Sequence, residues 1–436
     1  MTWLLLLALM FVVLLALFAS GLPVAFAFML INIVGFVVFV GGLDSLSLLI
    51  GSAFDSVASF PLVPIPLFIL MGEILLRSGL AAITIDAVDH WVGRLPGRLA
   101  IVTTGAGAVF GAVSGSSMAS TAVFAATLTP EMVRRGYKPP LSVGSVLAAG
   151  GLDVLIPPSA LGVLLAVIAG VSVAKLLVAS IVPGLLLAAV YALYFPIRVL
   201  IQPHLAPYSE TTPVPLSVRI RSLLQLLPLV LLMVVVTGFI FLGIATPSET
   251  AAMGAVAAAL LAAAYGRLDM AVIRDSLLVT AKVTAMVLLI IIGSKAYSQL
   301  LAISGVAAQL VEFATGLELL PILKVAAMMI VVLILGCFID QISIMLITVP
   351  IFMPIVLKMG MDPIWFSVCL LINLALAGIT PPFGLQLFVM KGARPEFAMT
   401  EIYMAALPIV LMQLLVIAFI MVYPPIATWM PSLMQQ

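Results

Sequence analysis

Two short stretches inside otherwise apolar segments decide the fold of this chain: Gly151-Leu-Asp-Val-Leu-Ile-Pro-Pro-Ser159 and Gly378-Ile-Thr-Pro-Pro-Phe-Gly384. Proline lacks an N–H group and disrupts the helix that precedes it, so each Pro-Pro pair frees backbone carbonyl groups. Inside a membrane such groups need partners from buried protein or a water-lined cavity. Each pair therefore marks either a simple kink or the centre of a broken helix.

The composition around these stretches is that of a membrane protein. Of the 436 residues, 64% are hydrophobic and only 8% are charged, against about 25% charged residues in soluble domains. So few charges cannot cover so large an apolar core in water, which excludes a soluble enzyme and a nucleic-acid-binding protein. We therefore expect an all-α, multi-pass membrane protein, because about 20 apolar residues span a bilayer as a helix.

The sequence lacks the residues that several common types of site require. The only histidines, His90 and His204, belong to no zinc-binding pattern, and no phosphate-binding loop for ATP is present. The two cysteines, Cys337 and Cys369, lie in apolar segments and are read as packing residues. We therefore expect neither a zinc site nor a chain that powers itself with ATP.

Two segments are too long and too interrupted to be single spanning helices. Residues 98–135 carry Ser114-Gly-Ser-Ser117 near their centre, and residues 320–358 carry Asp340. A helix of that length would overshoot the bilayer, so each segment predicts a re-entrant hairpin. A Gly/Ser-rich helix-packing face is the alternative for the first of them.

The order of segments repeats in the two halves of the chain. In each half a hairpin is followed by a proline-broken helix, at about 141–170 and about 363–390, with about 40 residues between hairpin tip and break. Residues 1–205 would form one repeat, 223–436 the other, and 206–222 a cytoplasmic linker. With most of the 18 basic residues on one face, which the positive-inside rule makes cytoplasmic, both termini lie outside and the repeats are inverted.

These motifs resemble the large membrane subunit of the tripartite ATP-independent periplasmic (TRAP) transporters. The resemblance rests on Phe110-Gly-Ala-Val-Ser-Gly-Ser-Ser117, Ile156-Pro-Pro-Ser159, Ala245-Thr-Pro-Ser-Glu249 and Thr380-Pro-Pro-Phe-Gly384, and it runs along the whole chain. It implies an elevator-type, Na⁺-coupled importer of small carboxylated solutes in the bacterial inner membrane. It also implies two partners, a small four-helix membrane subunit and a periplasmic substrate-binding protein.

The resemblance further implies two sodium sites and a substrate site between them. One sodium site would lie where Ser114 and Ser116 approach Asp153 and Ile156, and the other where Asp340 approaches Gly378 and Thr380. Paired prolines support this reading because freed carbonyl oxygens can coordinate a dehydrated Na⁺. The candidate substrate contacts are Ser117, Pro158, Lys295 and Pro381.

The remaining intramembrane charges have both structural and functional interpretations. Lys295, in an apolar segment, departs from the family pattern and either pairs with Asp340 or Glu249 or contacts the substrate. Glu249 either caps its helix or gates transport. Glu73 and Arg77, four residues apart, predict an ion pair on one helix face.

Two other functions stay open at this point. A self-sufficient Na⁺/anion symporter of the wider divalent-anion or ion-transporter type would share the inverted repeat but need no binding protein. An intramembrane enzyme would need Asp153 and Asp340 together in one site as an acid pair, whereas the sequence assigns each to its own repeat.

Overall fold

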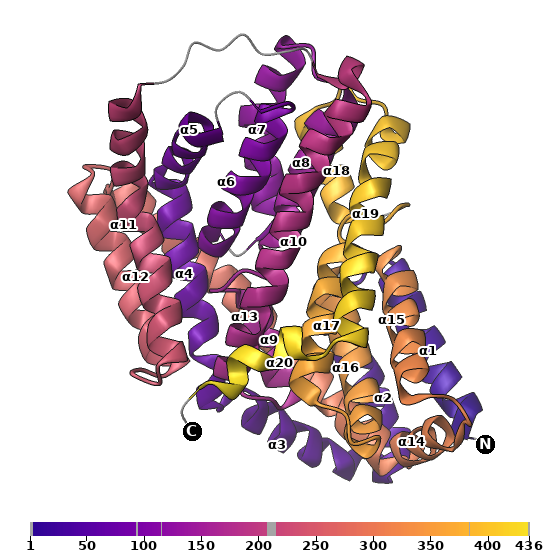
Figure 1. The fold of residues 1–436 in the computed structure, drawn as a ribbon. Coiled ribbons are helices and arrows are strands. Elements are labelled where there is room, and N and C mark those ends of the chain that lie inside the picture. The colour runs from indigo at the N-terminus through magenta and orange to yellow at the C-terminus, as the bar shows by residue number, and fades with distance from the viewer. Residues whose placement is uncertain (1–2, 93–94, 115, 207–214, 383, 435–436) are drawn as a thin grey trace.

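The computed structural model describes residues 3–92, 95–114, 116–206, 215–382 and 384–434, and the regular structure in these ranges is entirely helical. Eight helical segments in the described chain are long and apolar enough to cross a membrane. The predicted all-α, multi-pass fold is therefore confirmed. In Figure 1 the first and last described helices, α1 (Trp3–Ala19) and α20 (Pro425–Ser432), both lie toward the lower end of the molecule.

The first half of the chain runs from α1 to α10. Its further helices are α2 (Val24–Phe36), α3 (Leu46–Val57), α4 (Pro64–Arg77), α5 (Leu80–Val92), α6 (Arg98–Ser114), α7 (Ser117–Arg134), α8 (Pro139–Leu152), α9 (Ala160–Ala169) and α10 (Val173–Ile201). Short helical turns at Val37–Gly41, Gly42–Ser45, Phe60–Leu62 and Pro203–Leu205 join some of them.

The second half runs from α11 to α20. Its other helices are α11 (Leu216–Phe241), α12 (Pro247–Ala264), α13 (Met270–Ile303), α14 (Val306–Gly316), α15 (Pro321–Gly336), α16 (Gln341–Lys358), α17 (Pro363–Ala377), α18 (Leu385–Ala393) and α19 (Met399–Val422).

Both predicted hairpins and both predicted helix breaks are present. Helices α6 and α7 form the first hairpin and α15 and α16 the second, each pair in contact. The first broken helix consists of α8 and α9, which the Pro157-Pro158 segment separates, and the second of α17 and α18, which the Pro381-Pro382 segment separates. Both Pro-Pro peptide bonds are cis, so the two breaks match in backbone geometry as well as in sequence.

The matching elements of the two halves point in opposite directions (Figure 1). Helix α5, before the first hairpin, lies toward the upper end, and α14, before the second hairpin, lies at the lower end. Likewise α9 follows its break downward and α18 follows its break upward. The opposed directions are those of an inverted-topology repeat.

Helix α11 begins at Leu216, inside the expected linker 206–222, whose residues 207–214 lie outside the described ranges. Helix α13 runs without interruption from Met270 to Ile303. No proline or glycine interrupts residues 270–292, which explains why α13 does not break.

Glycines allow the first hairpin helix of each half to contact its broken helix at backbone distance. A Cβ on Gly107 of α6 would lie 2.8 Å from the Cα of Ala149 in α8. A Cβ on Gly336 of α15 would likewise lie 2.8 Å from the Cα of Ala377 in α17. Small residues at such interfaces are the usual means of helix association in membranes, where burial in lipid gives little driving force.

We expect Gly107→Ala to destabilise the protein by about 1–3 kcal/mol, because the added methyl group meets backbone atoms that cannot move aside. Thermal unfolding of the detergent-solubilised protein measures this. The matched control is Gly238→Ala in α11, where a Cβ meets nothing within 4 Å and alanine should stabilise the helix by about 0.5–1 kcal/mol. Equal melting temperatures for the two variants would contradict the close packing of α6 on α8.

Candidate functional site

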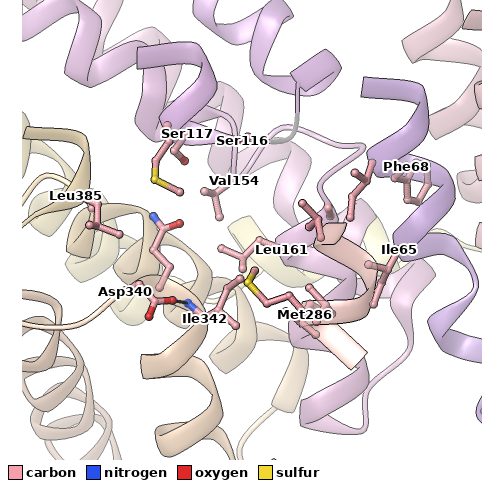
Figure 2. A pocket seen from close by; sticks show the side chains of 18 of the residues that line it. Ile65, Phe68, Ser116, Ser117, Val154, Leu161, Met286, Asp340, Ile342 and Leu385 are labelled. Atoms are coloured by element: carbon pink, nitrogen blue, oxygen red, sulfur yellow. Dashed lines mark hydrogen bonds between the residues drawn. The ribbon is translucent and has the colours of Figure 1, made fainter. Parts of the chain in front are cut away.

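The two hairpin tips and the two helix breaks meet at one central cavity of about 360 Å³. Figure 2 shows Ser116 and Ser117 of the first tip and Asp340 of the second tip around it. Helices α4 and α13 close the opposite side with apolar side chains, among them Phe68 and Met286. The cavity thus lies between elements that come from both halves of the chain.

The first hairpin tip presents two serines to this cavity. Ser116 is the N-cap of α7, and its Oγ accepts a hydrogen bond of 3.4 Å from the backbone N–H of Ala119. Ser117 is 6% exposed and its hydroxyl is buried without a hydrogen-bond partner among the described residues. Ser114 is the last residue of α6, and its side chain lies outside the described part of the structure.

The first helix break places a carboxylate and several carbonyl groups beside that tip. Asp153 is fully buried at the end of α8, and a Cβ on Gly111 of α6 would lie 2.2 Å from its Oδ1. Within the described chain, no backbone N–H donates to the carbonyl oxygens of residues 154–158, which include Ile156. Pro158 lines the cavity, whereas Asp153 and Ile156 are not among its lining residues.

The second hairpin tip is organised by Asp340. Its carboxylate accepts hydrogen bonds from the backbone N–H groups of Ile342 (3.0 Å) and Ser343 (3.1 Å) and from the Ser343 hydroxyl. These bonds satisfy first-turn N–H groups of α16 and place a negative charge at its positive end. Asp340 thus both lines the cavity and caps the N-terminus of α16.

The second helix break begins at Gly378, the C-cap of α17. The carbonyl of Gly378 accepts the backbone N–H of Gln386 (2.9 Å), and the Thr380 hydroxyl donates to the carbonyl of Leu376 (2.7 Å). The carbonyl oxygens of Ile379 and Pro381 accept no backbone N–H in the described chain. Gly378 lines the cavity, while Thr380 and Pro381 do not.

Two glutamines that the sequence analysis did not single out also line the cavity. Gln341 begins α16 and Gln386 lies in the first turn of α18. The Oε1 of Gln386 accepts a hydrogen bond of 3.2 Å from the Thr121 hydroxyl of α7, which leaves its amide NH₂ for other partners. Neither amide nitrogen has a hydrogen-bond partner in the described chain. No sequence motif marks these residues; what they share is a place in the first turn of a helix that begins at a hairpin tip or a helix break.

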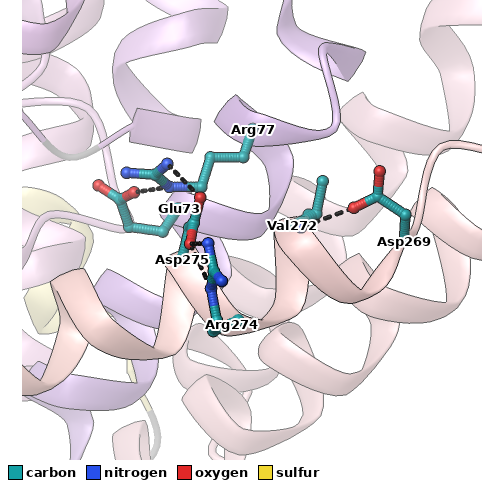
Figure 3. A network of polar contacts seen from close by, with 6 residues as sticks. All are labelled: Glu73, Arg77, Asp269, Val272, Arg274 and Asp275. Carbon is teal, nitrogen blue, oxygen red and sulfur yellow. Dashed lines mark hydrogen bonds and ion pairs between the residues drawn. The ribbon is translucent and has the colours of Figure 1, made fainter.

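The predicted ion pair between Glu73 and Arg77 is present, with 2.8 Å between Oε2 and Nε. Arg77 also lies 3.9 Å from Asp275 of α13, which in turn pairs with Arg274 at 2.9 Å (Figure 3). Glu73 lines the central cavity, whereas Arg77 does not. The network therefore ties α4 to α13 and leaves an acidic group on the wall that these helices form.

Glu249 caps the N-terminus of α12. Its carboxylate accepts the backbone N–H of Thr246 at 2.7 Å, and the Thr246 hydroxyl accepts the backbone N–H of Glu249 at 3.3 Å. This reciprocal capping box begins α12 at an exposed position.

Lys295 lies away from the central cavity. It is half-buried on α13 and lines a separate open pocket of about 770 Å³ together with Asp55 and Gln299. No ion pair of Lys295 is found in the described chain, so the structure brings it together with neither Asp340 nor Glu249.

This arrangement defines the class of the protein. Two inverted hairpins whose tips enclose a cavity beside two broken helices form a membrane transporter of the inverted-repeat kind. A solved structure with this fold, the Alcanivorax borkumensis YdaH transporter, superposes with a TM-score of 0.63 at 17% identity and covers 88% of this chain and 89% of its own.

The family follows from sequence comparisons. Residues 11–426 match the model of the DctM component of the tripartite ATP-independent periplasmic transporters. The C4-dicarboxylate TRAP transporter large permease protein DctM of Pseudomonas aeruginosa is 35% identical over 385 residues, which are 88% of each chain. The isethionate TRAP transporter permease protein DctMQ of Oleidesulfovibrio alaskensis is 31% identical over 95% of this chain and 66% of that longer protein.

The alignment with a third relative extends over almost the full length of both proteins. The ectoine/5-hydroxyectoine TRAP transporter large permease protein UehC of Ruegeria pomeroyi is 28% identical over 98% of this chain and 99% of its own. The chain belongs to the DctM family, the large permease subunits of TRAP transporters, as its motifs predicted.

We expect Lys295→Met to fold and to transport normally. Among the described residues the change leaves no carboxylate without an ion partner, so the free energy of unfolding should stay within about 0.5 kcal/mol of the wild type. Thermal unfolding and uptake in reconstituted vesicles measure the two effects. A loss of about 3–5 kcal/mol would reveal a buried ion partner, and a stable but inactive variant would assign Lys295 to transport.

Proposed function

We propose that this chain is the permease subunit of a Na⁺-coupled, binding-protein-dependent importer of small carboxylated solutes in a bacterial inner membrane. The observation that carries the proposal is the single cavity at which both hairpin tips and both helix breaks meet. Relatives are named for transport of C4-dicarboxylates, isethionate and ectoine, all small and charged or zwitterionic solutes.

Na⁺ is the proposed coupling ion because the donor groups fit it. The break at residues 153–159 offers carbonyl oxygens that accept no backbone N–H, beside the Ser116 hydroxyl and the buried Asp153 carboxylate. The break at residues 378–384 offers further carbonyls beside the Thr380 hydroxyl and the Asp340 cap. The described residues contain no cluster of three or more His, Cys, Asp or Glu side chains; the two sites consist mainly of neutral oxygen atoms, which suit a monovalent ion.

The proposed movement is that of an elevator. Helices α6–α9 and α15–α18 form the transport unit that carries the cavity, and the remaining helices form the scaffold. Two features support this division: each hairpin contacts the broken helix of its own half, and each also contacts the second half-helix of the other repeat, α7 with α18 and α16 with α9. The unit is thus connected within itself across the two repeats.

The proposed partners are a small four-helix membrane subunit and a periplasmic substrate-binding protein. The DctMQ permease extends beyond the region that this chain matches, which accommodates a second membrane component in the same polypeptide. We place both termini in the periplasm, because Arg77, Arg98, Arg134 and Arg198 then lie near the cytoplasmic ends of their helices.

The other candidate functions have less support. The cavity is lined by Asp340 but not by Asp153, so the two acids do not form the shared acid pair that an intramembrane enzyme needs. A self-sufficient symporter has the same fold, and only the requirement for a binding protein separates it from the proposed function.

Reconstitution tests the proposal directly. Vesicles containing both membrane subunits, with an inward Na⁺ gradient, should take up an organic acid only after the substrate-loaded binding protein is added outside, and replacing Na⁺ by K⁺ should abolish uptake. Robust Na⁺-driven uptake by this chain alone would establish the self-sufficient symporter instead. Uptake that is indifferent to Na⁺ would refute the coupling.

We expect Ser116→Ala and Thr380→Ala each to raise the Na⁺ concentration for half-maximal uptake, by about tenfold, because each removes an oxygen atom at a proposed sodium site. Ser116→Ala also removes a helix cap, so Ser172→Ala is its control: Ser172 caps α10 at 3.3 Å, outside the site. Thr380→Ser should restore the wild-type value. Unchanged Na⁺ dependence in both alanine variants would show that the sodium sites lie elsewhere.

A further inference from the structure

Most polar groups of the described cavity lining lie on the side of the hairpin tips. Figure 2 shows Ser117 and Asp340 on the side of the hairpin tips, and Ile65 and Phe68 on the opposite side. The side formed by α4 and α13 is lined by aliphatic, aromatic and methionine side chains, with Glu73 as its one polar group in the described cavity lining. A solute that fills the cavity therefore meets hydrogen-bonding groups at one end and hydrocarbon at the other.

Beside the Asp340 carboxylate, which caps α16, the polar side carries three hydrogen-bond donors that have no partner within the described chain. They are the hydroxyl of Ser117 and the amide nitrogens of Gln341 and Gln386. Ser117 is 6% exposed and Gln386 is 1% exposed. A buried donor without a partner is unfavourable, so donors that all line one cavity indicate a ligand that accepts from them.

The two amide nitrogens converge on the space above Gly378. A Cβ added to Gly378 would lie 2.6 Å from Nε2 of Gln386 and 3.1 Å from Nε2 of Gln341. Only a glycine leaves this space open. The Thr121 hydroxyl, which donates to the carbonyl of Ser117 at 2.8 Å, also lies 3.2 Å from Oε1 of Gln386, on the side of the amide away from Gly378. Two such donors with the Ser117 hydroxyl match the two oxygen atoms of one carboxylate.

The charges of the cavity argue against a second carboxylate on the solute. Among the described residues that line it, none is lysine or arginine, and the charged side chains are Glu73 and Asp340. A second carboxylate would be desolvated against the hydrocarbon side chains of α4 and α13, and Glu73, the charged residue on that side, offers it no positive charge. An apolar group in the same place gains from burial instead.

We propose, resting on the transport function above, that the solute is a single-headed amphipathic acid. Its one carboxylate accepts hydrogen bonds from Ser117, Gln341 and Gln386, and its branched or aromatic body lies against α4 and α13. This distinguishes the chain from its relative named for C4-dicarboxylates.

Three probes of nearly equal shape test the proposal. 4-Methylpentanoate carries an isopropyl group where succinate carries its second carboxylate, and 4-methylpentanamide keeps the isopropyl group but lacks the anionic head. We expect the permease, purified with its small subunit in saturating NaCl, to bind 4-methylpentanoate about tenfold more tightly than either other probe, as measured by calorimetric titration. Equal or tighter binding of succinate, or no binding of 4-methylpentanoate, would overturn the proposal.

Two variants test the assigned carboxylate site. Gln386→Glu puts a like charge beside the carboxylate, and Gly378→Ala fills the space between the amides. Each should weaken binding of 4-methylpentanoate by about tenfold or more. The control is Gly392→Ala in α18, where a Cβ meets nothing within 4 Å. If one variant does not fold, the other still decides, and wild-type affinity in a folded variant would refute the assigned contacts.

The two proposals fail separately. Na⁺-dependent, binding-protein-dependent uptake of succinate in reconstituted vesicles, with no preference for 4-methylpentanoate, would overturn the single-headed solute and leave the transport function intact. Tight binding of 4-methylpentanoate without any Na⁺-dependent uptake would support the site and refute the coupling.

Discussion

The structure depends on one constraint, that backbone carbonyl groups buried in a membrane protein must find partners. Each half of the chain contains one interrupted helix, at Pro157-Pro158 in the first half and at Pro381-Pro382 in the second. Each hairpin brings a helix N-terminus and its capping side chain to the level of a break, while the carbonyl oxygens of residues 154–158, Ile379 and Pro381 accept no backbone N–H in the described chain. Ser116 and Asp340 are those caps. The cavity lies between the two sets of interrupted helices.

That constraint also explains why both halves are needed for one site. A single hairpin and its broken helix have freed groups on one side and close glycine contacts on the other, at Gly107 or Gly336. Only the second, inverted copy closes the open side, and α7 then contacts α18 while α16 contacts α9. The hydrogen bond between Thr121 and Gln386 joins the repeats at this point. A half-chain would expose unsatisfied groups to lipid.

Much of this architecture could be predicted from the sequence, because proline pairs and charge-free runs have strong local consequences. The hairpins and breaks lie within a few residues of their predicted bounds, and the pairing of Glu73 with Arg77 followed from their spacing. The shared position of the two glutamines at the cavity could not be predicted, because Gln341 and Gln386 are 45 positions apart in sequence. Only the folding of α16 and α18 onto Gly378 brings them together. The place of Lys295 also depends on which face of the long α13 it occupies, which no local pattern determines.

The second break connects the proposed sodium site to the proposed carboxylate site through one residue. The backbone N–H of Gln386 donates to the carbonyl of Gly378 at 2.9 Å, and the side-chain amide of the same residue lies over the Cα of Gly378. A cation on the second lone pair of the Gly378 carbonyl would polarise this N–H bond, and any shift of the Gln386 backbone moves its amide. Ion binding and substrate binding would then be coupled within a single turn of chain, with no need for a path through the rest of the molecule.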